Sequence, residues 1–187
     1  GHTRFYDSDD DSQVADGPDT KTFKKPYSHP LDDQGNPERD WGRQSRIAPW
    51  GRASVDYGLL LGAAYQRLDF GFRKHPYAGR HTLHAGYSTG LQTGGVEYAY
   101  ESLRTDSRSR LQVAAKASAL DLIHYFGFGN ESNEVDSKSI YRVKVTQYAF
   151  RPAYRFEMSG ADIWLGAALK YADTHEDPET LLAQQQP

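Results

Sequence analysis

Histidine, serine and carboxylate side chains are the groups of this chain that could do chemistry. His81 and His84 are three residues apart in an extended segment, and a strand places such positions on opposite faces, where they do not chelate one metal ion. Ser88 and His84 lack the spacing of a catalytic triad, and no nucleophile elbow, phosphate-binding loop or zinc signature occurs. The absence of cysteine excludes thiolate sites and disulfides. We therefore expect no catalytic residue, no cofactor and no resident metal ion.

An acidic run near the start is a weak candidate for a calcium site. Asp7, Asp9 and Asp11 would fill the first, third and fifth positions of a calcium-binding loop. The pattern then fails, because Ser12 stands where glycine is required and Pro18 stands where a bidentate glutamate is required. A solvated acidic turn is the alternative interpretation.

A row of basic residues recurs on the predicted polar faces of two strands. Its members are Arg142, Lys144, Arg151, Arg155 and Lys170. Such charges are tolerated toward a water-filled lumen but cost about 2 to 4 kcal/mol at the midplane of a lipid bilayer. We expect them to pair with Glu97, Glu101 and Asp162 across the lumen, and a row that lines a conduit is the functional alternative.

The element that must position these groups is a strand with two chemically different faces. From Val55 to Tyr65 the odd positions are apolar and the even positions are mostly small or polar, as expected of a strand that separates two environments. Tyr57 and Tyr65 are about 26 Å apart in an extended chain, close to the roughly 25 Å apolar band of an outer-membrane barrel. The residues that we expect to face lipid are Tyr57, Leu59, Leu61, Tyr65, Val113 and Leu165.

The two-faced pattern recurs along the chain and predicts an all-β fold. We expect six long strands at residues 55–65, 81–91, 96–103, 111–121, 140–156 and 161–172. A tight turn is expected at Thr93-Gly94-Gly95, longer connections at residues 69–79 and 122–139, and a bulge near Thr146 where the apolar phase inverts. Together these features predict an antiparallel meander that forms part of a transmembrane β-barrel. Polar faces rich in glycine, alanine and serine favour this over a soluble sandwich, whose solvent faces would carry more lysine and glutamate.

Composition agrees with a barrel and excludes several other classes. The 187 residues are 37% hydrophobic, with a mean hydropathy of −0.78, which is lean for a soluble core. No run of about 18 apolar residues is present, so a spanning helix is excluded. The net charge of −3 gives no indication of nucleic-acid binding. Residues 1–50 are polar and predicted irregular apart from a short strand at Thr3 to Tyr6, as at the end of an upstream domain, and residues 51–187 form the barrel portion.

Two aromatic-glycine motifs and a following strand carry a family resemblance. Residues 70–77, 125–132 and 140–143 together resemble the BamA/TamA-like outer-membrane surface-antigen barrels, most closely bacterial members whose barrel follows other domains, in some cases a metallophosphoesterase. The resemblance covers residues 49–187 and implies a sixteen-stranded barrel of the bacterial outer membrane that inserts or exports polypeptide. Six strands do not close such a barrel, so the chain is expected to be a piece of a longer protein.

The second of these motifs has a physical interpretation of its own. It consists of Phe126, Gly127, Phe128, Gly129 and Asn130. Glycine and asparagine tolerate left-handed backbone conformations, so the chain can bend sharply between two aromatic anchors. We expect a structural corner at the rim of a barrel, and a direct role in gating or partner contact is the alternative.

The resulting functional hypothesis is a non-catalytic segment of an outer-membrane barrel involved in insertion, export or anchoring of polypeptide. Its expected partners are outer-membrane lipid and a polypeptide passenger or upstream periplasmic domain, and not nucleic acid. Two alternatives stay open: a soluble β-sandwich or barrel that binds a ligand, and a lipid-modifying barrel enzyme that uses His84 or Ser88. Which loops face outside also stays open.

Overall fold

The computed structural model describes residues 3–9, 12, 17–105, 107, 109–124, 142–158 and 161–175. All regular structure in these residues is β-structure, which confirms the predicted fold class. The strands are β1 (Thr3–Tyr6), β2 (Thr20–Phe23), β3 (Arg43–Ser54), β4 (Gly58–Gly71), β5 (Lys74–Ser88), β6 (Thr93–Leu103), β7 (Arg110–His124), β8 (Arg142–Met158), β9 (Ala161–Gly166) and β10 (Leu169–His175).

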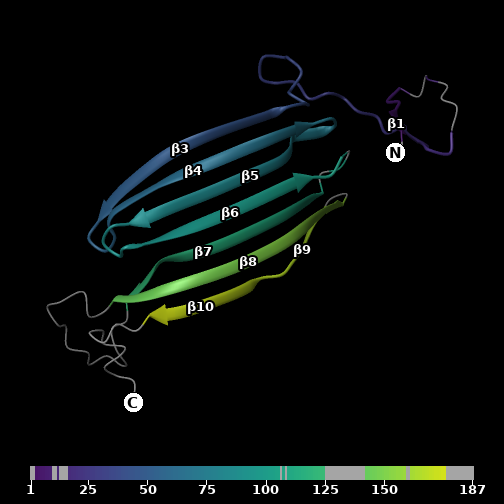
Figure 1. The fold of residues 1–187 in the computed structure, drawn as a ribbon. Helices are drawn as coiled ribbons and strands as arrows, with labels where there is room; N and C mark the ends of the chain where they lie inside the picture. Colours follow the sequence, from purple (N-terminus) through teal and green to yellow (C-terminus); the bar gives the residue numbers. More distant parts are fainter. Residues whose placement is uncertain are drawn as a thin grey trace.

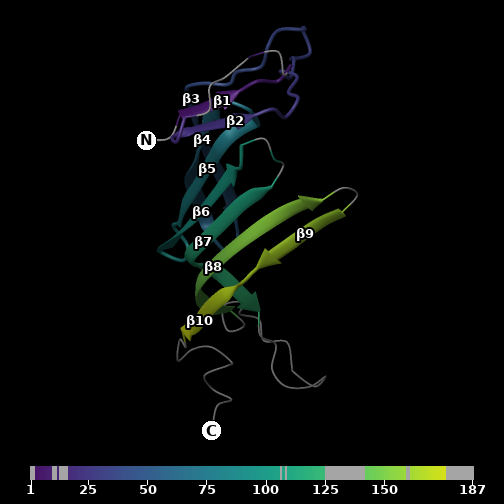
Figure 2. The same ribbon diagram turned by 90° about the vertical axis from the view of Figure 1, so that its right-hand side faces the viewer.

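One large antiparallel sheet contains the strands from β3 onward (Figure 1). Strands β3 to β8 follow one another in chain order, and β9 and β10 both pair with β8. The sheet is open, with β3 at one edge and β9 and β10 at the other. The antiparallel meander expected from the sequence is therefore present, as an open and strongly twisted sheet (Figure 2).

Strands β9 and β10 are two parts of one strand, as the sequence predicted for residues 161–172. Gly166 pairs with Ala153 and Leu169 pairs with Phe150, so the register continues without a shift across the interruption. The interruption lies opposite Pro152, whose carbonyl accepts a hydrogen bond of 3.0 Å from the amide of Ala167. Proline has no amide hydrogen to return this bond, so the ladder is interrupted at Ala167 and Ala168, between β9 and β10.

Strand β3 is the largest difference from the sequence-based expectation. Residues 43–50 were predicted irregular, yet they form most of a strand that pairs with β4 along its whole length. Because β3 adds one crossing of the sheet, the segment before Arg43 lies beside the tip of the β4–β5 hairpin. The ends of β7 and β10 lie at the opposite end of the sheet (Figure 1).

Three turns also lie elsewhere than predicted. Val55, Asp56 and Tyr57 form the turn between β3 and β4 rather than the start of a strand, and Gly58 follows with a φ of 61°. Residues 69–79 were predicted to be a connection, but only Phe72 and Arg73 lie between β4 and β5. The β5–β6 turn is at residues 89–92, so the predicted turn at residues 93–95 lies inside β6.

The bulge expected near Thr146 occurs on the neighbouring strand. Ser118 pairs with Gln147 and Asp121 pairs with Val145, so two residues of β7 lie opposite Thr146 of β8. β8 itself keeps a regular alternation through this point. Its valines at 143 and 145 therefore lie on the face opposite to Tyr148, and the prediction that a bulge in β8 keeps them on one side is wrong.

A small sheet of β1 and β2 lies against the β4–β5 hairpin (Figure 2). The strand at Thr3 to Tyr6 was predicted, whereas β2 was not. Arg73 at the hairpin tip joins the two sheets, because its guanidinium donates to Ser8 Oγ at 2.6 Å and lies 4.8 Å from the ring centres of Tyr6 and Tyr27. The positive φ of 55° at Arg73 turns the hairpin there.

Candidate functional site: the two faces of the large sheet

Pairing in the large sheet defines which side chains share a face. Directly opposed residues of antiparallel strands point to the same side, so the register can be followed from edge to edge. One such row consists of Ile47, Tyr65, Leu83, Tyr98, Ala115, Phe150 and Leu169. Every member is apolar or aromatic, and the strand spacing makes the row roughly 29 Å long. We call the side of the sheet that carries this row the apolar face.

Many of the large side chains on the apolar face are exposed. Ile47, Leu165 and Leu169 are 71%, 68% and 68% exposed. Most of the large hydrophobic side chains that are exposed in the described residues share this face, including Leu59, Leu61, Tyr87, Val96, Leu111, Tyr148, Phe156, Ile163 and Tyr171. Soluble monomers rarely expose a contiguous apolar patch larger than a few hundred Å². The number of exposed apolar side chains on this face is therefore unusual for a soluble monomer.

Five of the six residues predicted to face lipid lie together on the apolar face. The register places Leu59, Leu61 and Tyr65 of β4, Val113 of β7 and Leu165 of β9 on this side. Tyr57 does not belong with them, because it lies in the β3–β4 turn before β4 begins. Its assignment failed because alternation continues through the turn residues, so the pattern alone does not locate the strand end.

The opposite side of the sheet, the polar face, carries small and charged residues. One complete row across it consists of Ala48, Ala64, His84, Glu97, Lys116, Ala149 and Lys170. Lys116 lies 3.0 Å from an Asp121 carboxylate oxygen and 3.7 Å from Glu97. Shallow hollows on this face are lined by Trp50, His84, Glu97, Lys116 and Arg151 among others. A water-filled space suits such a surface better than lipid does.

The predicted basic row does not lie on one face. Arg151, Arg155 and Lys170 point to the polar face, whereas Lys144 points to the apolar face, because β8 has no bulge at Thr146. Placing Lys144 in the row was therefore wrong. The side chain of Arg142 lies outside the part of the structure that is described.

Among the side chains that the structure describes, the predicted pairing of this row occurs once. Arg155 forms an ion pair with Asp162. Glu97 pairs with Lys116 instead, and the described residues provide no ion-pair partner for Arg151 or Lys170.

Glu101 forms a buried ion cluster that the sequence interpretation did not identify. Its side chain is 5% exposed and lies 2.6 Å from Arg80 Nη2 and 2.5 Å from Arg110 Nη1. The hydroxyl of Tyr77 donates to the same carboxylate at 3.1 Å. Three adjacent strands are tied together by this one carboxylate. The strand register could have revealed this cluster, because Arg80 lies directly opposite Glu101 in the β5–β6 pairing.

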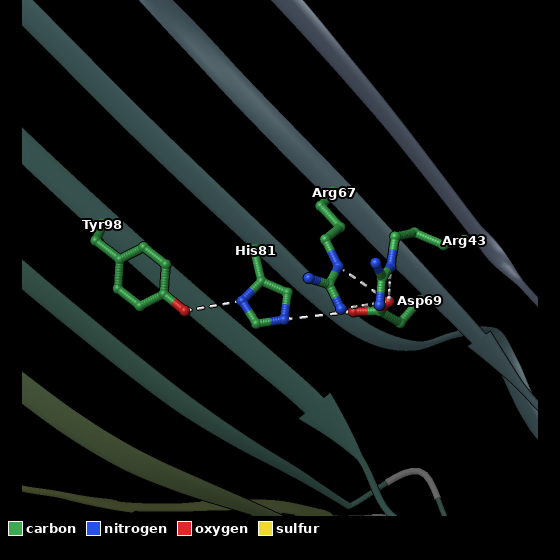
Figure 3. A network of polar contacts seen from close by, with 5 residues as sticks. All are labelled: Arg43, Arg67, Asp69, His81 and Tyr98. Atoms are coloured by element: carbon green, nitrogen blue, oxygen red, sulfur yellow. Dashed lines mark hydrogen bonds and ion pairs between the residues drawn. The ribbon is translucent and has the colours of Figure 1, made fainter.

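A second polar cluster lies on the apolar face, near the ends of β3 and β4 (Figure 3). Asp69 Oδ1 accepts from Arg43 Nε at 3.0 Å and from Arg67 Nε and Nη2 at 3.0 and 2.9 Å. His81 lies between this carboxylate, at 3.4 Å, and the hydroxyl of Tyr98, at 2.8 Å. His81 and His84 are on opposite faces, as predicted, and cannot share a metal ion.

The remaining candidates give no chemical site. Asp7 is buried and accepts a hydrogen bond from the Ser12 amide at 3.1 Å, Asp9 is exposed, and Asp11 lies outside the described residues. In the described ranges no group of three or more histidine and carboxylate side chains could hold a metal ion. Ser88 is fully buried, and its hydroxyl donates to the Tyr57 carbonyl and accepts from the Leu91 amide. That hydroxyl therefore has a role in the turn.

The rim motif at residues 126–130 lies outside the described residues. None of the residues that the structure describes forms a helix long and apolar enough to cross a membrane. Comparison with protein-family models, with curated proteins and with solved structures gives no match.

Proposed function

We propose that this chain is a membrane-spanning portion of a β-barrel of the bacterial outer membrane, where it anchors, inserts or exports polypeptide without catalysing a reaction. The observation that carries the proposal is the exposed apolar face, which crosses every strand of the large sheet. Lipid is the apolar medium that covers such a face along its whole width, and a water-filled lumen suits the polar face.

The dimensions of the apolar face support this proposal. On β8 the apolar and aromatic side chains run from Tyr148 to Phe156, about 26 Å along an extended strand. A barrel strand tilted by roughly 40° converts this length to about 20 Å of membrane thickness, close to the roughly 25 Å apolar band of outer-membrane barrels. Aromatic side chains at both positions fit the aromatic girdles of such barrels.

Both edges of the sheet need partners in this setting. Unpaired backbone groups are not tolerated in hydrocarbon, so β3 and the β9–β10 edge must pair with further strands of the same or another chain. Six antiparallel steps separate β3 from β10, and the two edge strands therefore run in the same direction. An antiparallel barrel can close only if an odd number of further strands is added.

Strand β3 also supports one orientation of the sheet across the membrane. The small β1–β2 sheet lies at the end of the β4–β5 hairpin, whereas β7 ends and β8 begins at the other end (Figure 1). Outer-membrane barrels have short periplasmic turns and longer external loops. The long connection between β7 and β8 would then be external, and the β1–β2 sheet would be periplasmic.

The polypeptide-handling role rests on the family resemblance of residues 70–77, 125–132 and 140–143, and the polar face agrees with it. Arg151 and Lys170 carry positive charge on the polar face, which would line the path of a passenger segment. Of the two residues of the lipid-modifying alternative, Ser88 has its hydroxyl buried in a turn, whereas His84 lies on the polar face opposite Glu97. A soluble binding domain would require another cover for the apolar face.

The experiment that tests the proposal is folding with and without detergent. We expect a β-rich circular-dichroism spectrum and a defined solution size only in detergent micelles or lipid, because water cannot solvate the apolar face favourably. A monomer that folds cooperatively in plain buffer would overturn the membrane assignment and favour a soluble β-domain.

A further inference from the structure

We propose that Arg43 and Arg67 bind the phosphate group of an anionic phospholipid at the rim of the apolar face. This inference rests on the proposed function, because only a face that meets lipid brings these side chains to a headgroup. It adds a ligand of stated chemistry and a site of two arginines on adjacent strands.

The two arginines are positioned by a single carboxylate. Both donate to Asp69 Oδ1, and His81 approaches Asp69 Oδ2 from the next strand (Figure 3). Arg43 pairs directly with Asp69, and Arg67 pairs with His81, so the whole cluster is fixed by the register of β3, β4 and β5. Its geometry therefore exists before any ligand arrives.

The cluster has a net positive charge and N–H donors that its internal hydrogen bonds do not use. Two guanidinium groups share one carboxylate, which leaves a net positive charge whichever form His81 takes. Arg43 uses only Nε in the described contacts, and Arg67 uses Nε and Nη2. Each guanidinium has five N–H donors, and the side chain of Arg43 is 60% exposed. Arginine favours phosphate because its planar fork matches two phosphate oxygens.

The location of the cluster suits a headgroup rather than an acyl chain. Tyr65, two residues before Arg67 on the same face of β4, belongs to the apolar row. The cluster is therefore adjacent to the apolar part of the surface, where acyl chains would lie. Tyr98 also belongs to this row, and its hydroxyl contacts His81, as expected where aromatic side chains mark the boundary of a bilayer.

The position also indicates which lipid supplies the phosphate. The cluster lies toward the end of the sheet that carries the β1–β2 sheet, which is the periplasmic end in the proposed orientation. The leaflet on that side of an outer membrane contains phospholipid, whereas lipopolysaccharide occupies the external leaflet. We therefore assign the site to a phospholipid such as phosphatidylglycerol.

The test measures lipid selectivity by electron paramagnetic resonance of spin-labelled lipids. The full chain is incorporated into phosphatidylcholine bilayers, and the association of spin-labelled phosphatidylglycerol is compared with that of spin-labelled phosphatidylcholine. We expect a preference of roughly three- to tenfold for phosphatidylglycerol at this site. The preference should be lost in the double variant Arg43→Ala, Arg67→Ala and partly kept in Arg43→Lys, Arg67→Lys, which preserves charge but not the planar fork.

The matched control is the double variant Arg46→Ala, Arg52→Ala. This variant also removes two positive charges, but both lie on the polar face of β3. It should leave the preference for phosphatidylglycerol unchanged. Equal loss in both double variants, or no preference in the unaltered chain, would overturn the phosphate site. Displacement of the labelled lipid by lipopolysaccharide rather than by unlabelled phosphatidylglycerol would support the site but overturn its assignment to phospholipid. A chain that does not enter bilayers would overturn the proposed function, and the site with it.

Discussion

The indole of Trp50 on β3 lies directly over Gly62 on β4. A methyl group built on Gly62 would lie 2.3 Å from Trp50 Cζ2 and 2.3 Å from the Ala85 carbonyl oxygen, and one built on Gly86 would lie 2.9 Å from Trp50 Cη2. The indole thus covers the backbone of two neighbouring strands on the polar face. These glycines are required for close approach of the ring.

Replacement of Gly62 by alanine should therefore destabilise the sheet. We expect Gly62→Ala to lower the free energy of unfolding by about 1 to 3 kcal/mol, because the ring and strand must move apart. Urea titration in detergent micelles measures this. Gly79→Ala is the control, since its nearest neighbour would be at an ordinary 3.6 Å, and it should be neutral or stabilising by up to about 1 kcal/mol. Equal losses in both variants would contradict the role of Trp50.

The Glu101 cluster predicts a large effect of one neutral substitution. Glu101→Gln removes the charge that Arg80 and Arg110 share, and the part of the chain that the structure describes offers these two guanidinium groups no other ion pair. We expect a loss of roughly 3 kcal/mol in the free energy of unfolding, typical of breaking a buried pair. Glu97→Gln tests an exposed carboxylate, at 59% exposure and 3.7 Å from Lys116, and should cost less than about 1 kcal/mol. The same urea titration compares them, and a smaller loss for Glu101→Gln than for Glu97→Gln would contradict the cluster's role.

The contacts of Arg73 predict that this residue anchors the β1–β2 sheet to the β4–β5 hairpin. Arg73→Gly keeps the positive φ but removes the guanidinium that contacts Ser8, Tyr6 and Tyr27. Loss of cation–π contacts worth about 1.4 kcal/mol should raise the open population of residues 3–42 roughly tenfold. Limited proteolysis should then cleave this segment faster while the large sheet persists. Lys74→Ala removes a neighbouring charge and should leave cleavage unchanged, and equal rates in all three proteins would contradict the anchor.

Asp32 predicts a pH dependence in the loop between residues 31 and 37. The Asn36 amide donates to Asp32 Oδ1 at 2.8 Å and the Gln34 amide does so at 2.9 Å, and these bonds, with that of Asn36 first, lower the pKa of Asp32. A lowered folded-state pKa means that the loop is stabilised above the ordinary carboxyl pKa of about 3.9 and loses this stabilisation as the pH falls through the lowered value. The Asn36 amide shift in NMR should titrate accordingly. Asp32→Asn should abolish that titration, and a midpoint above the ordinary value would contradict it.

The alternation of apolar and polar residues predicted the interior strands because one face of each strand is apolar and the other is small or polar. In β4 up to Tyr65, and in β7 up to Ser118, apolar residues mostly alternate with small or polar ones. The same pattern cannot specify an edge strand such as β3, where Pro49 and Gly51 interrupt it. Strand β3 forms in spite of these two residues because it pairs with β4 along its whole length, so contacts within the sheet override local propensity.

The sequence-based prediction of the β5–β6 turn was wrong because it relied on glycine. Gly94 and Gly95 were expected to provide a turn, but they lie in β6, where a methyl group would be 2.8 Å from the Gly86 carbonyl oxygen and from Ser118 Oγ, respectively. Close approach of strands and a tight turn both select glycine, and one sequence does not distinguish them. The polar clusters were missed for a similar reason, because Arg43, Asp69 and His81 come together only through the register of three strands.

Site-directed spin labelling tests the central claim most directly, because the chain has no cysteine that would compete with an introduced one. Labels at Leu61, Val113 and Leu165 report on the apolar face, and labels at Gln66, Gln112 and Gln147 report on the polar face. In lipid bilayers we predict that the first set is relaxed by oxygen, which concentrates in lipid, and the second set by a water-soluble nickel chelate. Access of the chelate to all six positions would contradict the claim that the apolar face spans a membrane.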